Sequence, residues 1–173
     1  MNKKKDKHIV LMGFKNAGKT VVGKELARRT GMPFLDLDDE IEKQASMKCR
    51  EIVQTQGEKA FRTIETETLK KVLATDTPSI VALGGGAILA AENQELIREH
   101  KKALITGDKN TLFNRIIKKG RPMIFGKEGT DREAFERVYT EREPMYEQLA
   151  DMKVDNSGKV ESAVEEIIKH LTS

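Results

Sequence analysis

Residues 13–20 carry the clearest chemical pattern in this chain of 173 residues. They read Gly-Phe-Lys-Asn-Ala-Gly-Lys-Thr, which is the spacing of a phosphate-binding P-loop, and they directly follow the short apolar run 8–12. Glycines at the two ends, Gly13 and Gly18, let successive backbone N–H groups turn inward around phosphate oxygens with no Cβ in the way. Lys19 adds a positive charge, and Thr20 adds a hydroxyl for Mg²⁺.

A chance match to a glycine-rich turn is the alternative interpretation of this loop. It is disfavoured because the strand, both glycines, the Lys-Thr pair and a helical stripe of Val21, Val22 and Leu26 all fall in register. The loop therefore predicts nucleotide binding. The residues expected to contact the nucleotide here are Gly13, Asn16, Ala17, Gly18, Lys19, Thr20 and Val21.

Two carboxylates follow in the extended run 34–38, which reads Phe-Leu-Asp-Leu-Asp. Alternation along a strand would place Asp36 and Asp38 on one face at its carboxyl end, where open α/β sheets bind ligands. A structural role would leave two neighbouring carboxylates without a counter-ion, so a functional role is favoured. P-loop proteins often carry an acidic metal ligand at the end of a later strand, and the strand predicted at 79–83 has none. Asp36 is therefore the candidate for magnesium.

Three consecutive glycines, Gly84, Gly85 and Gly86, come directly after the apolar run 79–83, which is typical of a buried parallel strand. They could form only a tight turn between strand and helix. Three flexible residues in a row are conformationally costly, however, and at the end of a buried strand they allow a ligand to approach the backbone closely. The position favours a ligand site.

Two other patterns each have two interpretations. Arg62 and Glu65 lie three residues apart on one helical face, which favours an ordinary surface ion pair over a functional one. Residues 121–131 combine glycines with basic side chains, so they form either a mobile lid over a phosphate site or a plain surface loop.

Composition limits the class of protein. Lys and Arg number 31 against 28 Asp and Glu, for a net charge of +3, and aromatic residues are 5%. We therefore expect no nucleic-acid partner.

No apolar stretch is long enough to cross a bilayer, so no membrane partner is expected either. The single cysteine, Cys49, suits a reducing cytoplasm. The length suits one domain, 1–173, with residues 1–7 as a basic disordered tail.

Strands and helices alternate along the chain with short loops between them. Strands are predicted at 8–12, 34–38, 79–83, 103–105 and 152–154. Helices are predicted at 19–30, from 39 or 40, from 57, at 92–100, at 111–119, at 131–141, from 142, and near the end of the chain. This order predicts an α/β fold with a parallel sheet and helices on both faces. Its ligand edge would collect the P-loop, Asp36 with Asp38, and the three glycines, which together describe a kinase for a small molecule.

At this point the chain resembles the shikimate kinase family over nearly its whole length. The residues that carry the resemblance are the P-loop, 34–38, Gly57-Glu58 with Phe61-Arg62 and Glu65, 83–87, 121–123, Arg142 ahead of Pro144-Met145-Tyr146, and 154–156. The resemblance implies a P-loop NTPase fold of the nucleoside-monophosphate-kinase type, with a five-stranded parallel sheet and a mobile lid at 121–131. It implies phosphorylation of the 3-hydroxyl of shikimate by ATP, in aromatic amino acid biosynthesis, by a monomer that uses Mg²⁺.

The same resemblance implies roles for individual residues. Lys19 would bridge the outer phosphates, Thr20 and Asp36 would hold Mg²⁺, and Asp38 would bind the acceptor hydroxyls and accept or orient the proton. The remaining residues would bind substrates: Arg62 and Arg142 the carboxylate of shikimate, Gly84, Gly85 and Gly86 its hydroxyl side, Arg121 the transferring phosphoryl group, and Arg115 and Asp155 the nucleotide.

Two departures from the family pattern leave alternatives open. The loop centre, Lys15-Asn16-Ala17, is bulkier and more basic than usual, and Val53 stands where an aromatic residue is common. The alternatives are a kinase of the same fold for another small hydroxy acid such as gluconate, and a regulator that binds ATP and shikimate without turnover.

Overall fold

Five strands form one sheet in a computed structural model that describes residues 7–173. Most of the tail predicted at 1–7 therefore lies outside the described residues. The strands are β1 (Ile9–Met12), β2 (Phe34–Asp36), β3 (Ile80–Ala82), β4 (Lys101–Thr106) and β5 (Met152–Asp155). Every neighbouring pair is parallel, and the order across the sheet is β2-β3-β1-β4-β5. The predicted five-stranded parallel sheet is confirmed.

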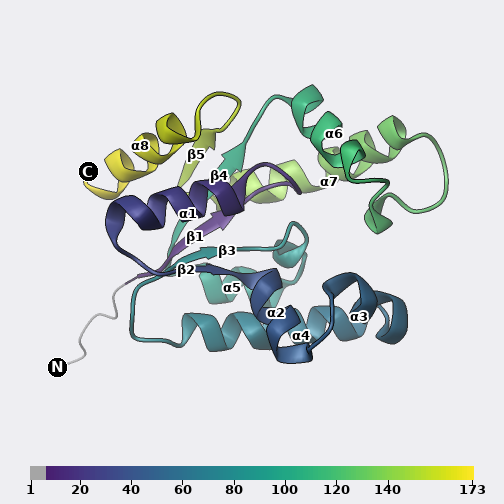
Figure 1. Ribbon diagram of the computed structural model, residues 1–173, viewed down its shortest axis with the longest axis horizontal. Coiled ribbons are helices and arrows are strands. Elements are labelled where there is room, and N and C mark those ends of the chain that lie inside the picture. The colour runs from purple at the N-terminus through teal and green to yellow at the C-terminus, as the bar shows by residue number, and fades with distance from the viewer. Residues whose placement is uncertain (1–6) are drawn as a thin grey trace.

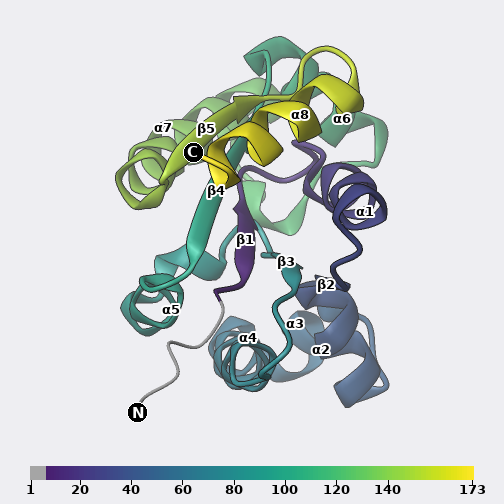
Figure 2. The ribbon, with the colours of Figure 1, turned by 90° about the vertical axis from the view of Figure 1, so that its left-hand side faces the viewer.

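Helices cover both faces of the sheet. They are α1 (Lys19–Thr30), α2 (Leu37–Ala45), α3 (Cys49–Gln56), α4 (Glu58–Leu73), α5 (Ala91–Ile97), α6 (Lys109–Lys118), α7 (Asp131–Leu149) and α8 (Val160–Leu171), with short 3₁₀ turns η1 (Ala87–Leu89) and η2 (Met123–Phe125). In Figure 1, α1 lies in front of the sheet and α5 and α7 lie behind it. Figure 2 shows the same layers from the side, with β1 between α1 and α5. Val10, Leu11 and Met12 are fully buried because β1 is covered on both faces.

The strand order determines where the predicted site residues meet. β3 pairs with β1 on one side and with β2 on the other. The P-loop after β1, the two aspartates after β2 and the three glycines after β3 therefore emerge from adjacent strands at one sheet edge. Parallel strands end on the same side, so this edge is the expected ligand site of the fold.

One predicted element is wrong at Asp38. The strand β2 ends at Asp36, and α2 begins at Leu37, so the two aspartates do not share one strand face. The cause is local, since the side chain of Asp36 accepts a hydrogen bond of 3.1 Å from the backbone N–H of Asp38 and caps α2. Asp38 is therefore in the first turn of a helix, and helical geometry positions it.

The helix break predicted at residue 142 is also wrong. α7 runs unbroken through Pro144, and its N-cap is Thr130, which forms a capping box with Glu133. The buried face of α7 extends on both sides of the proline, from Phe135 to Tyr146, so packing holds the helix together. Residues 49–56, for which no element was predicted, form α3, and the helix predicted at 92–100 ends at Ile97.

An aromatic cluster fastens the P-loop to α7. The ring of Phe14 lies edge-on to the ring of Phe135, with centroids 5.5 Å apart, and at the same centroid distance from Tyr139. Phe113 and Phe125 also contact the ring of Phe135. Such ring pairs contribute beyond their buried area, so the P-loop and the buried face of α7 are held as one unit.

Gly23 lets α1 pack closely against the sheet, and this closeness can be tested. A Cβ there would lie 2.7 Å from Cδ2 of Phe34 and 3.1 Å from Cδ1 of Leu11. Although alanine is the better helix former, we expect Gly23→Ala to lower the free energy of unfolding by about 1–3 kcal/mol through overpacking. Urea unfolding measures the effect. Gly158→Ala is the matched control because nothing lies within 4 Å of its Cβ position, and an equal loss in both variants would contradict the packing explanation.

Candidate active site

The three glycines form a surface against which side chains from three other elements lie. A Cβ on Gly84 would be 2.9 Å from Oδ1 of Asp38, and one on Gly86 would overlap the guanidinium of Arg62, with its Cζ at 3.0 Å. A Cβ on Gly85 would be 3.4 Å from the backbone nitrogen of Lys15 and 3.7 Å from Nη1 of Arg142. The missing Cβ atoms at Gly84 and Gly86 leave room for these side chains, so the loop brings Asp38, both arginines and the P-loop around one space.

Lys19 lies at the start of α1, inside the P-loop. Its ammonium donates hydrogen bonds to the carbonyl oxygens of Gly13 at 2.7 Å and Phe14 at 2.9 Å. Burial lowers the pKa of Lys19 to about 8, and the carboxylates of Asp38 and Asp36 oppose that change. The lysine is therefore a buried cation close to both aspartates.

Two oxygen ligands suitable for a hard cation lie side by side. The hydroxyl of Thr20 donates to Oδ2 of Asp36 at 2.8 Å, which brings together the two residues that the sequence assigns to magnesium. Among residues 7–173, no group of three or more His, Cys, Asp or Glu side chains could hold a metal. A cation here would need further oxygen ligands from phosphates and water, which is how Mg²⁺ is usually bound beside nucleotides.

Asp38 has the electrostatic properties of a proton acceptor. Burial raises the pKa of its carboxyl group, the charge of Asp36 raises it further, and the ammonium of Lys19 opposes both. A carboxylate whose pKa is raised holds a proton more readily in a reaction than an exposed one does. The same carboxylate faces the glycine loop at Gly84.

The ion pair between Arg62 and Glu65 exists, with Nη1 and Oε1 2.8 Å apart, but it is not at the surface as the sequence suggested. Glu65 is only 1% exposed, and burial raises its pKa while Arg62 lowers it. Its other oxygen is 3.3 Å from the Cβ position of Gly84. Glu65 therefore holds Arg62 against the glycine loop, and this positioning role was missed because spacing alone does not indicate burial.

Arg142 reaches the same loop from the buried face of α7. It is 6% exposed, and burial lowers the pKa of its guanidinium while the nearby charge of Arg62 lowers it further. The hydroxyl of Tyr146, one turn later, donates a hydrogen bond to the carbonyl oxygen of Gly85. Two arginines that point at one glycine loop make a site for an anion with planar oxygens, such as a carboxylate.

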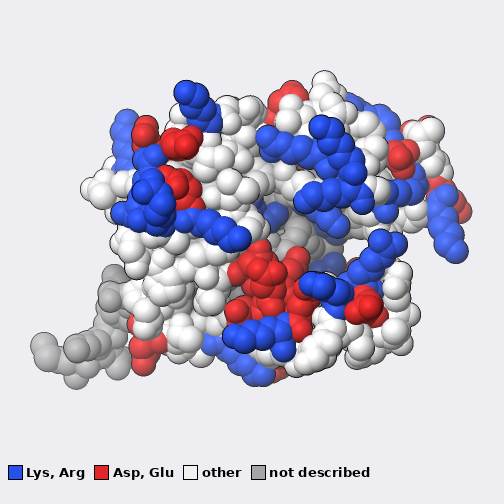
Figure 3. Space-filling view, viewed as in Figure 1, with Lys and Arg blue, Asp and Glu red and all other residues white. Residues whose placement is uncertain are grey.

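A cleft of about 480 Å³ lies on the other side of the P-loop. Its lining residues are Asn16, Gly18, Lys19, Thr20, Val21, Arg115, Lys118, Lys119, Asn156 and Val160. In Figure 3 a basic patch over α6 and an acidic patch over α2 flank a depression in the surface. The structure thus brings Arg115 to the predicted nucleotide residues of the P-loop.

Asp155 does not line this cleft, and Asn156 does. The carboxylate of Asp155 accepts hydrogen bonds from the backbone and hydroxyl of Ser157, whereas Asn156 donates to the carbonyl oxygen of Ala17 at 3.0 Å. Asn156 directly follows β5, and this position at the carboxyl end of a strand could have predicted its place in the cleft. Lys118 and Lys119 were missed because a lysine at a helix end ordinarily indicates only solvent exposure.

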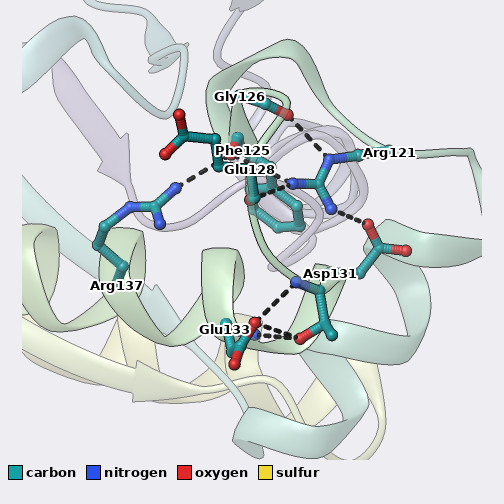
Figure 4. A network of polar contacts seen from close by, with 8 residues as sticks. Arg121, Phe125, Gly126, Glu128, Asp131, Glu133 and Arg137 are labelled. Atoms are coloured by element: carbon teal, nitrogen blue, oxygen red, sulfur yellow. Dashed lines mark hydrogen bonds and ion pairs between the residues drawn. The ribbon is translucent and has the colours of Figure 1, made fainter.

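The structure does not direct Arg121 toward the P-loop. Its guanidinium pairs with Asp131 and donates to the carbonyl oxygens of Gly126 and Glu128, each at 2.9 Å (Figure 4). These partners all belong to the segment 121–131 predicted as a lid. A role for Arg121 at the phosphates stays a prediction that requires the segment to rearrange.

Across residues 7–173, none of the helices has the length and apolar character needed to cross a membrane.

Several known proteins with similar sequences and structures are shikimate kinases. The shikimate kinase family model matches residues 15–172. The chain is 38% identical to the shikimate kinase of Moorella thermoacetica, over 94% of this chain and 92% of that protein, and 39% identical to that of Geobacter sulfurreducens, over 93% and 88%. The structure of shikimate kinase from Acinetobacter baumannii in complex with shikimate has a TM-score of 0.87 at 28% identity, with 96% and 93% of the two chains covered. The structure from Aquifex aeolicus has a TM-score of 0.83 at 29% identity, with 95% and 96% covered.

Proposed function

The chain belongs to the shikimate kinase family, and we propose that it transfers the γ-phosphoryl group of ATP to the 3-hydroxyl of shikimate, giving ADP and shikimate 3-phosphate. The observation that supports this most is the meeting of three strand ends around one space. A Cβ on Gly85 would lie 3.4 Å from the backbone nitrogen of Lys15 in the P-loop, and the same glycines face Asp38, Arg62 and Arg142. A triphosphate and a hydroxy acid would be neighbours there.

The acceptor would be held by charge and by shape. The guanidinium groups of Arg62 and Arg142 would bind its carboxylate, and the backbone of Gly84, Gly85 and Gly86 would approach its ring and hydroxyls. Asp38 would accept a hydrogen bond from the reacting hydroxyl and take its proton as the phosphorus–oxygen bond forms. Two guanidinium groups bind any anion with paired oxygens, so the choice of a hydroxy acid as acceptor rests on the family to which the chain belongs.

The donor would lie in the cleft on the P-loop side. Lys19 would release the carbonyls of Gly13 and Phe14 to bind outer phosphate oxygens, and Arg115 would lie beside the base. Bound Mg²⁺, held by Thr20 and Asp36, would neutralise charge on the phosphates. Arg121 would exchange Asp131 for the transferring phosphoryl group when the lid closes.

We propose that the enzyme acts as a monomer. Its single cysteine, Cys49, is consistent with a reducing compartment such as the cytoplasm, and we propose no nucleic-acid or membrane partner. Sedimentation of the active enzyme in the presence of substrates would test the monomer.

Lys19 makes nucleotide binding depend on pH. Its pKa of about 8 in the folded protein lies below the ordinary value of 10.5, so between these values the unfolded chain holds a proton that the folded chain lacks. The contribution of Lys19 to stability therefore rises with pH through this window. Bound phosphates favour the ammonium form, so ADP binding above pH 8 should take up a proton, and the affinity should fall by up to about tenfold per pH unit.

Titration calorimetry in buffers of different ionisation enthalpy measures this proton uptake. Lys19→Met is the control, since it cannot take up a proton at this position. An affinity for ADP that does not change between pH 8 and pH 10 would contradict the assignment of Lys19.

A coupled assay of ADP release, run with shikimate, quinate and gluconate, tests the function itself. We expect turnover with shikimate to exceed turnover with the other two acids by orders of magnitude. Preference for gluconate would indicate a different acceptor. Binding of ATP and shikimate without ADP release would indicate a regulator.

A further inference from the structure

Asn16 occupies a position in the P-loop that few residues other than glycine adopt. Its φ is 61°, in the left-handed region, and it lies midway between Gly13 and Lys19. Its side chain is held, because Oδ1 accepts a hydrogen bond of 3.1 Å from the ammonium of Lys119. Its amide nitrogen Nδ2 is buried and has no hydrogen-bond partner within residues 7–173. The side chain thus has one atom that fixes a lysine and one donor without a partner.

Lys119 reaches the P-loop from the C-terminal end of α6. Its backbone N–H closes the last turn of that helix, and Gly120, with φ 88°, then turns the chain into the segment 121–131. Lys119 and Asn16 both line the cleft that contains Lys19 and Thr20. The contact therefore joins the phosphate-binding loop to the base of the predicted lid.

We propose that Lys119 is a second phosphate-binding cation of the nucleotide site, and that Asn16 holds it in place over the P-loop. This inference rests on the proposed function, because its ligand is the polyphosphate group of ATP or ADP. The ammonium has three N–H donors, so it can keep its bond to Asn16 and offer another to a phosphate oxygen. A bond to a phosphate oxygen is stronger than one to a neutral amide oxygen, since both partners are charged.

Asn16 adds pre-organisation to this charge. A free lysine side chain loses rotamer freedom when it binds a ligand, and a lysine already held by Asn16 loses less. The buried Nδ2 of Asn16 would itself donate to a phosphate oxygen and so gain a partner in the complex. The two residues therefore act together on the phosphates, and their effects on affinity should be coupled.

The test is equilibrium binding of ADP and of ATP to the whole chain by titration calorimetry. Lys119→Met should weaken both nucleotides by about tenfold and make binding less sensitive to salt. Lys169→Met is the control, because Lys169 is an exposed lysine near the end of α8 that does not line the cleft. We expect it to weaken binding by about twofold or less, as for a solvent-exposed charge.

Asn16→Gly tests the coupling. Glycine adopts a φ of 61° without strain, so this change removes the side chain and keeps the loop conformation. In the Asn16→Gly background, Lys119→Met should cost only about threefold or less. Equal losses in both backgrounds would refute the role of Asn16. Unchanged affinity in Lys119→Met, or an equal loss in Lys169→Met, would refute the role of Lys119.

These results separate the inference from the proposed function. ADP binding needs no acceptor, so a wild-type protein that binds ADP but does not phosphorylate shikimate would refute the acceptor and leave Lys119 in place. Normal turnover of shikimate together with unchanged ADP binding in Lys119→Met would refute only the inference. Melting temperatures of all variants show whether they fold.

Discussion

Replacing Asp38 with asparagine is expected to lower kcat for shikimate by a factor of about 10²–10⁴, the usual size of a lost general base. Asparagine keeps the shape of the side chain but cannot accept the proton of the reacting hydroxyl. Burial and Asp36 raise the pKa of Asp38, which suits it to this task. The measurement is the rate of ADP release at saturating ATP and shikimate.

The affinity for ADP should change little in Asp38→Asn, since Asp38 is not among the residues that line the nucleotide cleft. Asp39→Asn is the matched control, because Asp39 lies in the same first turn of α2 and is exposed. Near-normal turnover in Asp38→Asn would remove Asp38 from the chemistry. A similar loss in both variants would indicate that the substitutions act by disturbing the first turn of α2, or by removing negative charge from it, and not by removing a proton acceptor.

Replacing Arg62 with alanine is expected to weaken the binding of shikimate by about 2–5 kcal/mol, because it removes one half of a charged pair at a partly buried site. The carboxylate of shikimate would lose a planar, two-pronged donor, and Arg142 alone would remain. Arg62→Lys should recover only part of the loss, since a lysine is a point charge without the fork. The measurement is the dissociation constant of shikimate by calorimetry.

If Arg62 binds the carboxylate of shikimate, its effect on affinity should depend on the presence of that carboxylate. An analogue of shikimate with a hydroxymethyl group in place of the carboxylate should bind wild type and Arg62→Ala almost equally. If Arg62→Ala weakens both compounds by the same factor, the arginine does not act on the carboxylate. Because Glu65 would lose its partner, the melting temperature of Arg62→Ala must be compared with that of the wild type.

The sheet and the P-loop could be predicted because local patterns specify them. The apolar runs of β1 and β3 match strands covered on both faces, and the glycines at 13 and 18 have the positive φ angles that the loop requires. The order of the strands across the sheet was not predicted. Strand pairing is a property of the whole fold, so no single segment contains it.

The errors in the prediction have physical causes that a linear pattern hides. Alternation predicts Asp38 to be part of a strand, but the side chain of Asp36 caps a helix that begins two or three residues earlier than expected. Pro144 suggests a helix end, but buried side chains on both sides keep α7 continuous. Glu65 reads as a surface partner of Arg62, and only the folded chain shows that it is buried against the glycine loop.

The nucleotide side of the site was the part least visible in the sequence. Arg115 and the P-loop were predicted, whereas Asn156 and Lys119 come to the cleft from strand and helix ends whose neighbours the sequence does not indicate. Lys119 is separated from its partner Asn16 by 103 residues, so their contact depends on how α6 lies over the P-loop. Contacts of this kind follow from the tertiary structure alone.

The central claim is that the triphosphate and the hydroxy acid occupy one space between the P-loop and the glycine loop. A crystal structure of the Asp38→Asn variant with ATP, Mg²⁺ and shikimate tests it most directly, because slow turnover should preserve the substrates. We expect the shikimate carboxylate on Arg62 and Arg142 and its 3-hydroxyl directed at both position 38 and the γ-phosphorus. Shikimate bound away from Gly85, or with its carboxylate directed toward Lys19, would contradict the account.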